Sequence, residues 1–124
     1  MNTKRPINLD LMTMKFPPMA IASILHRLSG LLLLLLLPYI LYLLHQSLIS
    51  AASFAQLNLF LTQPLAKFGL WLFLSALTYH LLAGIRHLLM DYGIGESLRA
   101  GKASAIFVIT AAGILMIGIG IWLW

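Results

Sequence analysis

The chain has no cysteine and few charged residues. Of its 124 residues, 9% are charged and 61% are hydrophobic, whereas a soluble globular domain has about 25% charged residues. This composition predicts an integral membrane protein, and the length fits one compact unit, so a catalytic domain would have to sit on another chain. The absence of cysteine excludes disulfides, zinc–thiolate sites and iron–sulfur ligation within this chain. A metal bound here would need histidine.

Three long apolar runs account for most of the sequence. They cover about residues 22–49, 65–91 and 103–124, and each reaches the roughly 20 residues needed to cross a hydrocarbon core of about 30 Å. All three are expected to be helices, because backbone polar groups in lipid must find their hydrogen-bond partners within the segment. The predicted fold is therefore an all-α integral membrane protein with three transmembrane helices in a lipid bilayer, preceded by a short cytoplasmic or interfacial segment, residues 1–20.

Prolines and polar stretches indicate where these helices begin, bend and end. Pro17 and Pro18 are typical of a helix start, and Pro38, inside the first apolar run, is the expected kink position. The uncharged stretch 47–64 and the glycine-rich, charged stretch 92–102 are both predicted to be interfacial loops.

The basic residues are distributed unevenly along the chain. Seven of the eight basic residues lie before or at the start of the first span or around the second connection: Lys4, Arg5, Lys15, Arg27, Arg86, Arg99 and Lys102. Only Lys67 lies on the other side. The positive-inside rule then predicts a cytoplasmic N-terminus and second connection, and an external C-terminus. Nucleic acid is not an expected partner, because the net charge of +5 is confined to short juxtamembrane clusters without a recognition motif. No cleavable signal is expected.

The second apolar run contains polar residues that share one face of the expected helix. An α-helix turns by about 100° per residue. One stripe of the helix surface, about 60° wide around the axis, therefore carries His80, Gly84, His87 and Asp91. A charged side chain near the centre of a membrane costs roughly 2.5–3.5 kcal/mol on insertion scales, so such residues usually have a function. Arg86 falls about 120° away from His80, near the cytoplasmic end, where its long side chain is expected to snorkel to the interface.

His80 lies deeper than the other polar residues of this stripe, about 15 Å from Met90 along the helix. A lone intramembrane histidine can bridge helices or shuttle protons as readily as it ligates a metal. Gly84 would let a bulky planar group approach the helix, and His87 lies about 10 Å from His80 along the axis, comparable with the distance from a haem iron to its propionates. On spacing alone, a b-type haem is one of these alternatives.

A second polar set lies where the first span meets the cytoplasm. Ser23, Arg27 and Gly30 share one helix face, and His26 is adjacent at about −60° from Ser23. In the simplest interpretation Arg27 anchors the chain at the interface and Ser23 bonds a neighbouring helix. A hydroxyl and a guanidinium on one face can also donate hydrogen bonds to carbonyl oxygens, as a quinone head group would require, or pair with haem propionates.

These motifs resemble those of a known family. The stretches RPINLDL, SILHRLSG and HLLAGIRHLLMDYG are similar to the cytochrome b membrane anchor of succinate dehydrogenase (complex II) in its proteobacterial form. The similarity extends from Arg5 to the C-terminus. It implies an anchor subunit of succinate:ubiquinone oxidoreductase in the bacterial inner (cytoplasmic) membrane, with the succinate-oxidising site on another chain.

The resemblance assigns roles to individual residues. It makes His80 the axial ligand of the haem b iron, and Ser23 and Arg27 the residues that bind ubiquinone. The group near the haem and its propionates comprises His26, Arg27 and His87, with Gly84 lining the haem pocket. Asp91 matches a charged residue near the quinone pocket, whereas His45 matches no motif and is expected to be structural or interfacial.

The resemblance also implies three protein partners. A flavoprotein subunit would oxidise succinate, an iron–sulfur subunit would relay electrons, and a second anchor subunit would supply the other haem ligand, since only one deep histidine is present here. A fumarate reductase anchor and a scaffold that only tethers soluble subunits are the competing interpretations. A transporter is disfavoured by three spans without a repeat or a broken helix pair.

Reporter fusions test the predicted orientation. A fusion after Gly95 should report a cytoplasmic location, because the basic residues around the second connection hold it inside, and a fusion at Trp124 should report an external one. An external signal from the Gly95 fusion would overturn this topology.

Overall fold

The computed structural model describes residue 7, residues 9–10, residue 12 and residues 14–124. Lys4 and Arg5, which contribute to the predicted orientation, lie outside the described residues. The described part of the chain contains no strand and consists of four helices: α1 (Pro18–Ile49), α2 (Ala51–Phe60), α3 (Pro64–Asp91) and α4 (Leu98–Leu123). Three of them, α1, α3 and α4, are long and apolar enough to cross a membrane. The expected all-α membrane fold is thus confirmed.

Local sequence explains where the long helices begin. α1 starts at Pro18 and α3 at Pro64, where a missing N–H is harmless because the first N–H groups of a helix have no partner within it. α4 starts at Leu98 after Ser97, whose hydroxyl accepts a hydrogen bond from the N–H of Ala100. α1 and α4 therefore begin several residues before the apolar runs that they contain. Where each enters the membrane stays a prediction.

The connection between α1 and α3 is mostly helical, so the expected loop was wrong for this stretch. α2 (Ala51–Phe60) follows α1 almost directly, and the hydroxyl of Ser50 caps it by accepting from the N–H of Ser53 at 3.0 Å. The segment contains alanine, glutamine and leucine and has no internal glycine or proline, so its helix propensity is high. The polar but uncharged character of this stretch predicts a loop, whereas its helix propensity and the Ser50 cap favour a helix.

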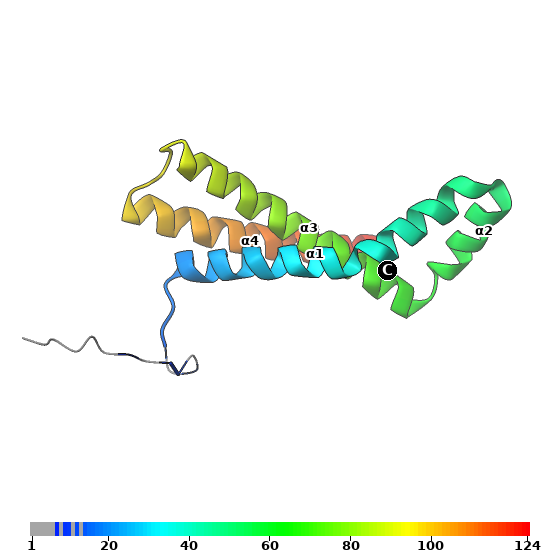
Figure 1. Ribbon diagram of the computed structural model, residues 1–124, viewed down its shortest axis with the longest axis horizontal. Helices are drawn as coiled ribbons and strands as arrows, with labels where there is room; N and C mark the ends of the chain where they lie inside the picture. Colours follow the sequence, from blue (N-terminus) through cyan, green and yellow to red (C-terminus); the bar gives the residue numbers. More distant parts are fainter. Residues whose placement is uncertain (1–6, 8, 11, 13) are drawn as a thin grey trace, which may run out of the picture.

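α1 changes direction along its length. Pro38 lies inside this helix, where its ring leaves the carbonyl of Leu34 without an N–H partner. In Figure 1 α1 runs beside α3 and α4 from its start to beyond its middle, and its last part extends away from them together with α2. The position of Pro38 fits the kink expected there.

Small side chains let the three long helices pack closely. One buried hydrophobic cluster combines Tyr79 and Ala83 from α3 with Val108 and Ala112 from α4. The three long helices also bury further alanines, namely Ala22, Ala66, Ala76 and Ala105. Packing of this kind is typical of membrane helices, which associate through close backbone approach rather than through the exclusion of water. The hydroxyl of Tyr79 donates to the carbonyl of Ala22 at 2.8 Å and so joins α3 to α1.

Two further aromatic side chains donate hydrogen bonds to backbone carbonyls of a neighbouring helix. The hydroxyl of Tyr39 on α1 donates to the carbonyl of Ala66 on α3 at 2.7 Å. The indole N–H of Trp71 on α3 donates to the carbonyl of Met116 on α4 at 2.9 Å. Buried tyrosine and tryptophan need partners for their polar groups, and here these partners fix the contacts between helices.

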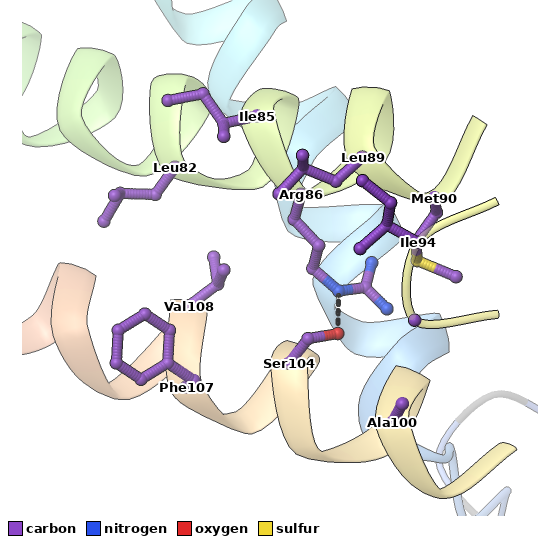
Figure 2. A pocket seen from close by; sticks show the side chains of 11 residues that line it. Leu82, Ile85, Arg86, Leu89, Met90, Ile94, Ala100, Ser104, Phe107 and Val108 are labelled. Atoms are coloured by element: carbon purple, nitrogen blue, oxygen red, sulfur yellow. Dashed lines mark hydrogen bonds between the residues drawn. The ribbon is translucent and has the colours of Figure 1, made fainter. Parts of the chain in front are cut away.

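Arg86 joins the end of α3 to the start of α4. Its Nε donates to the hydroxyl oxygen of Ser104 at 2.9 Å, and its Nη2 donates to the carbonyl of Gly101 at 3.1 Å. Figure 2 shows this side chain reaching from α3 towards α4, at the wall of an apolar cavity of about 320 Å³ between the two helices. These hydrogen bonds direct the Arg86 side chain towards the start of α4, and its expected snorkelling to the interface stays a prediction.

Substitution of Arg86 tests this contact. Arg86→Leu should lower the free energy of unfolding by about 1.5–3 kcal/mol, because hydrogen bonds from a charged donor are lost. Thermal unfolding in detergent would measure the change. Arg99→Leu is the matched control, since it removes the same charge from an exposed position on α4 and should change stability by less than about 0.5 kcal/mol. Equal effects of the two substitutions would contradict the assignment.

Candidate functional site

Three histidines from two helices meet in the half of the bundle where α1 begins and α3 ends. His26 comes from α1, and His80 and His87 come from α3. The rings of His26 and His80 stack with their centroids 4.3 Å apart, and the centroids of His26 and His87 are 6.4 Å apart. The structure thus brings together the two polar sets that the sequence placed on separate helices.

Hydrogen bonds hold the His80 ring by its Nδ1 atom. This atom lies 3.0 Å from the hydroxyl oxygen of Ser29 and 3.3 Å from the carbonyl oxygen of His26. The Ser29 hydroxyl donates its own proton to that same carbonyl at 2.7 Å, so its oxygen is left to accept. A carbonyl oxygen can only accept. Both neighbours therefore select the tautomer of His80 that carries its proton on Nδ1.

In this tautomer the Nε2 atom of His80 has a free lone pair. No hydrogen bond among the described residues uses that atom. Metal-bound histidines usually donate their other N–H to a carbonyl, a carboxylate or water, which fixes the orientation of the ring. The part of the chain that the structure describes has no group of three or more His, Cys, Asp or Glu residues able to hold a metal ion. The free Nε2 and the bonded Nδ1 together make His80 a candidate metal ligand.

Two glycines lie against the histidine rings. A Cβ atom at Gly30 would be 3.2 Å from Cε1 of His80, and one at Gly84 would be 3.6 Å from Nε2 of His26. The first distance is too short for comfortable packing, so Gly30 allows α1 to approach the His80 ring. The sequence suggested that Gly84 leaves space for a planar group, and the planar group next to it in the structure is the His26 imidazole.

A polar cavity of about 210 Å³ opens beside the histidines. Its lining comes from α1 and α3 and consists of Ala22, Ser23, His26, Arg27, Ala83, Arg86 and His87. It therefore contains Ser23 and Arg27, the two residues expected to bind a quinone. Both are exposed, and neither side chain has a hydrogen-bond partner among the described residues. Their donor groups are thus free to bind a ligand.

A second cavity adjoins the first towards the end of α3. Its volume is about 460 Å³, and its lining consists of Met19, Ser23, Arg86, His87, Met90, Asp91 and Glu96. Asp91 contributes to this wall, and its Oδ2 lies 4.0 Å from Nε2 of the exposed His87. Because Ser23, Arg86 and His87 line both cavities, Asp91 and the predicted quinone residues belong to one continuous region.

The sequence left two contacts of this site unrecognised. Ser29 was not singled out, although its place one helical turn after His26 is a signal that could have identified it. Arg86 was considered only as an interfacial residue, and the structure shows that it also lines both polar cavities. His45 lies about 28 Å from His26 along the helix and is exposed, so its structural or interfacial role stays a prediction.

Comparison with known proteins shows the family of the chain. A family model described as "Succinate dehydrogenase/Fumarate reductase transmembrane subunit" matches residues 1–119. The "Succinate dehydrogenase cytochrome b556 subunit" of Coxiella burnetii (strain RSA 493 / Nine Mile phase I) is 49% identical over 125 residues, an alignment that covers 100% of both chains. The chain is therefore a multi-pass membrane protein that belongs to the family of succinate dehydrogenase and fumarate reductase transmembrane subunits.

Proposed function

We propose that this anchor subunit binds haem b and forms part of the ubiquinone-reduction site of succinate:ubiquinone oxidoreductase in the bacterial inner membrane. The observation that carries the proposal is the hydrogen bonding of His80, which leaves Nε2 free to bind a metal. The cytochrome b556 name of the Coxiella burnetii relative supports haem b as the group that is bound.

His80 would ligate the haem iron through Nε2. His26 stacks on His80 and would pack beside the ligand rather than serve as a ligand itself. A histidine of a second anchor subunit would supply the other ligand. Arg27, His26 and His87 would donate hydrogen bonds to the haem propionates, and Gly84 would line the pocket. When bound, the haem supplies a one-electron redox group whose potential depends on its ligands and burial.

Ser23 and Arg27 would bind the head group of ubiquinone. Their hydroxyl and guanidinium groups face a polar cavity and are not used by other described residues. Donors that are already positioned stabilise negative charge as it develops on the quinone oxygen. The cavity volume of about 210 Å³ is below the roughly 300–1,000 Å³ of typical ligand sites. Partner subunits would therefore complete the pocket.

The remaining subunits would supply the electrons. A flavoprotein subunit would oxidise succinate, and an iron–sulfur subunit would pass the electrons to ubiquinone, which also takes up two protons. Asp91 and His87 lie 4.0 Å apart in the wall of the adjoining cavity, where they would support proton delivery from the cytoplasmic side. The proposed orientation, with the N-terminus inside and the C-terminus outside, places this region next to the soluble subunits.

A fumarate reductase anchor would use the same architecture in the opposite direction, and the matching family description includes both enzymes. A scaffold that only tethers soluble subunits is the other alternative. It would gain nothing from a membrane histidine with one fixed tautomer or from donors that face a cavity without partners. These features favour participation in electron transfer.

Removal of His80 tests haem ligation. In the purified complex, His80→Ala should remove or strongly perturb the low-spin haem absorption bands, because the iron loses an axial nitrogen. His45→Ala, which alters an exposed histidine on the same membrane subunit, should leave these bands unchanged. A wild-type spectrum in the His80→Ala complex would show that the ligand is assigned wrongly.

Substitutions of Ser23 and Arg27 test the quinone site. Ser23→Ala and Arg27→Leu each remove an interaction worth roughly 1–3 kcal/mol, so the quinone reductase kcat/KM should fall about five- to hundredfold. Succinate oxidation by a soluble dye should stay near normal, since the dye can take electrons before they reach the membrane. Ser47→Ala, an exposed substitution on α1, is the matched control.

The two activities must be compared in the same preparations, because Arg27 is also assigned to a haem propionate. A parallel loss of both activities would indicate a defect in assembly. Unchanged quinone reduction in both variants would mean that Ser23 and Arg27 serve only to anchor the chain. Either result would contradict the assignment of Ser23 and Arg27 to the quinone pocket.

A further inference from the structure

We propose that Ser29 is a positioning residue that sets the reduction potential of the haem bound by His80. This inference rests on the proposed ligation by His80 and extends it to a neighbouring side chain that does not touch the iron. Ser29 is 7% exposed, and its hydroxyl has both of its hydrogen-bond partners within the chain.

Both hydrogen-bonding roles of the Ser29 hydroxyl are fixed by its neighbours. It donates to the carbonyl of His26 at 2.7 Å, one turn back along α1, and this uses its only proton. Its oxygen then accepts from Nδ1 of His80 at 3.0 Å. The His26 carbonyl is the other acceptor for the same N–H, at the longer distance of 3.3 Å. Ser29 is therefore the nearer acceptor and the only one of the two that a side-chain substitution can remove.

An acceptor on Nδ1 changes the electronic character of the whole imidazole. It draws the Nδ1 proton away from the ring and makes Nε2 a stronger electron donor, which raises the basicity of the ligand. A more basic ligand stabilises ferric over ferrous iron, so the bond to Ser29 should hold the midpoint potential down. The effect is enhanced inside a membrane, where the low dielectric strengthens hydrogen bonds.

The His80 ring keeps other restraints when Ser29 is changed. His26 stacks on one face with the centroids 4.3 Å apart, and the Gly30 backbone approaches closely enough that a Cβ there would lie 3.2 Å from Cε1. These contacts do not involve the Ser29 hydroxyl. Loss of the hydroxyl should therefore alter the electronic properties of the ligand more than the position of the ring, so the haem should be retained at a changed potential.

Ser75 provides a matched control. It is also buried, at 4% exposure, and it lies on α3, five residues before His80. Its hydroxyl has no hydrogen-bond partner among the described residues. Ser75→Ala thus removes a buried hydroxyl from the same part of the bundle without changing any hydrogen bond to His80.

The test is a potentiometric titration of the haem bands in the complete purified complex. Ser29→Ala should give a higher midpoint potential than the wild type. Ser29→Thr should restore a potential near that of the wild type, because threonine keeps a hydroxyl that can bond the carbonyl three residues earlier in a helix. Ser75→Ala should not change the potential. An unchanged or lower potential in Ser29→Ala, or an equal rise in Ser75→Ala, would overturn the proposal.

A further variant covers the case in which Ser29→Ala does not assemble. Ser29→Cys has a similar volume but a sulfur that accepts hydrogen bonds weakly, so it should also raise the potential, and a wild-type value would overturn the proposal. The His80→Ala spectrum distinguishes an error in the ligation by His80 from an error in the role of Ser29. If His80→Ala keeps the wild-type bands, ligation by His80 is wrong; if it loses them while the Ser29 variants keep the wild-type potential, only the role of Ser29 is wrong.

Discussion

A polar side chain persists inside a membrane when its hydrogen-bonding groups have partners, and the hydrogen bond at Nδ1 of His80 meets this requirement across two helices. It fixes the tautomer of the ring, and it requires α1 to approach α3 closely enough for Ser29 to reach it. Gly30 makes this approach sterically acceptable. The same contact that joins the two helices thus leaves Nε2 of His80 without a hydrogen bond among the described residues.

Elsewhere in the bundle the same constraint is met by donors that bond backbone carbonyls. Tyr79, Tyr39 and Trp71 each reach a carbonyl of an adjacent helix, and Arg86 reaches the carbonyl of Gly101. These bonds differ from the site in one respect. They satisfy both partners within the chain, whereas Ser23 and Arg27 keep free donors beside a cavity. We propose that these free donors bind the quinone.

The sequence predicted the parts of the structure that depend on one segment at a time. Apolar runs of sufficient length identify α1, α3 and α4, and helical periodicity places His80 and His87 on one face. The sequence did not predict α2, because a ten-residue helix gives no long apolar run. The contacts of Ser29 and Arg86 could not be predicted, because they depend on which atoms of a second helix lie within hydrogen-bond distance. Periodicity within one helix carries no information about the neighbouring helix. The residues identified through family motifs did converge on one region.

The central claim is that this subunit holds a haem through His80, shared with a second anchor subunit. A reduced-minus-oxidised absorption spectrum of the purified complex tests it most directly, because the bands of a low-spin b-type haem arise only when the iron has two strong axial ligands. We expect such bands, with one haem for each copy of this chain. A complex that oxidises succinate and reduces quinone but shows no haem absorption would contradict it.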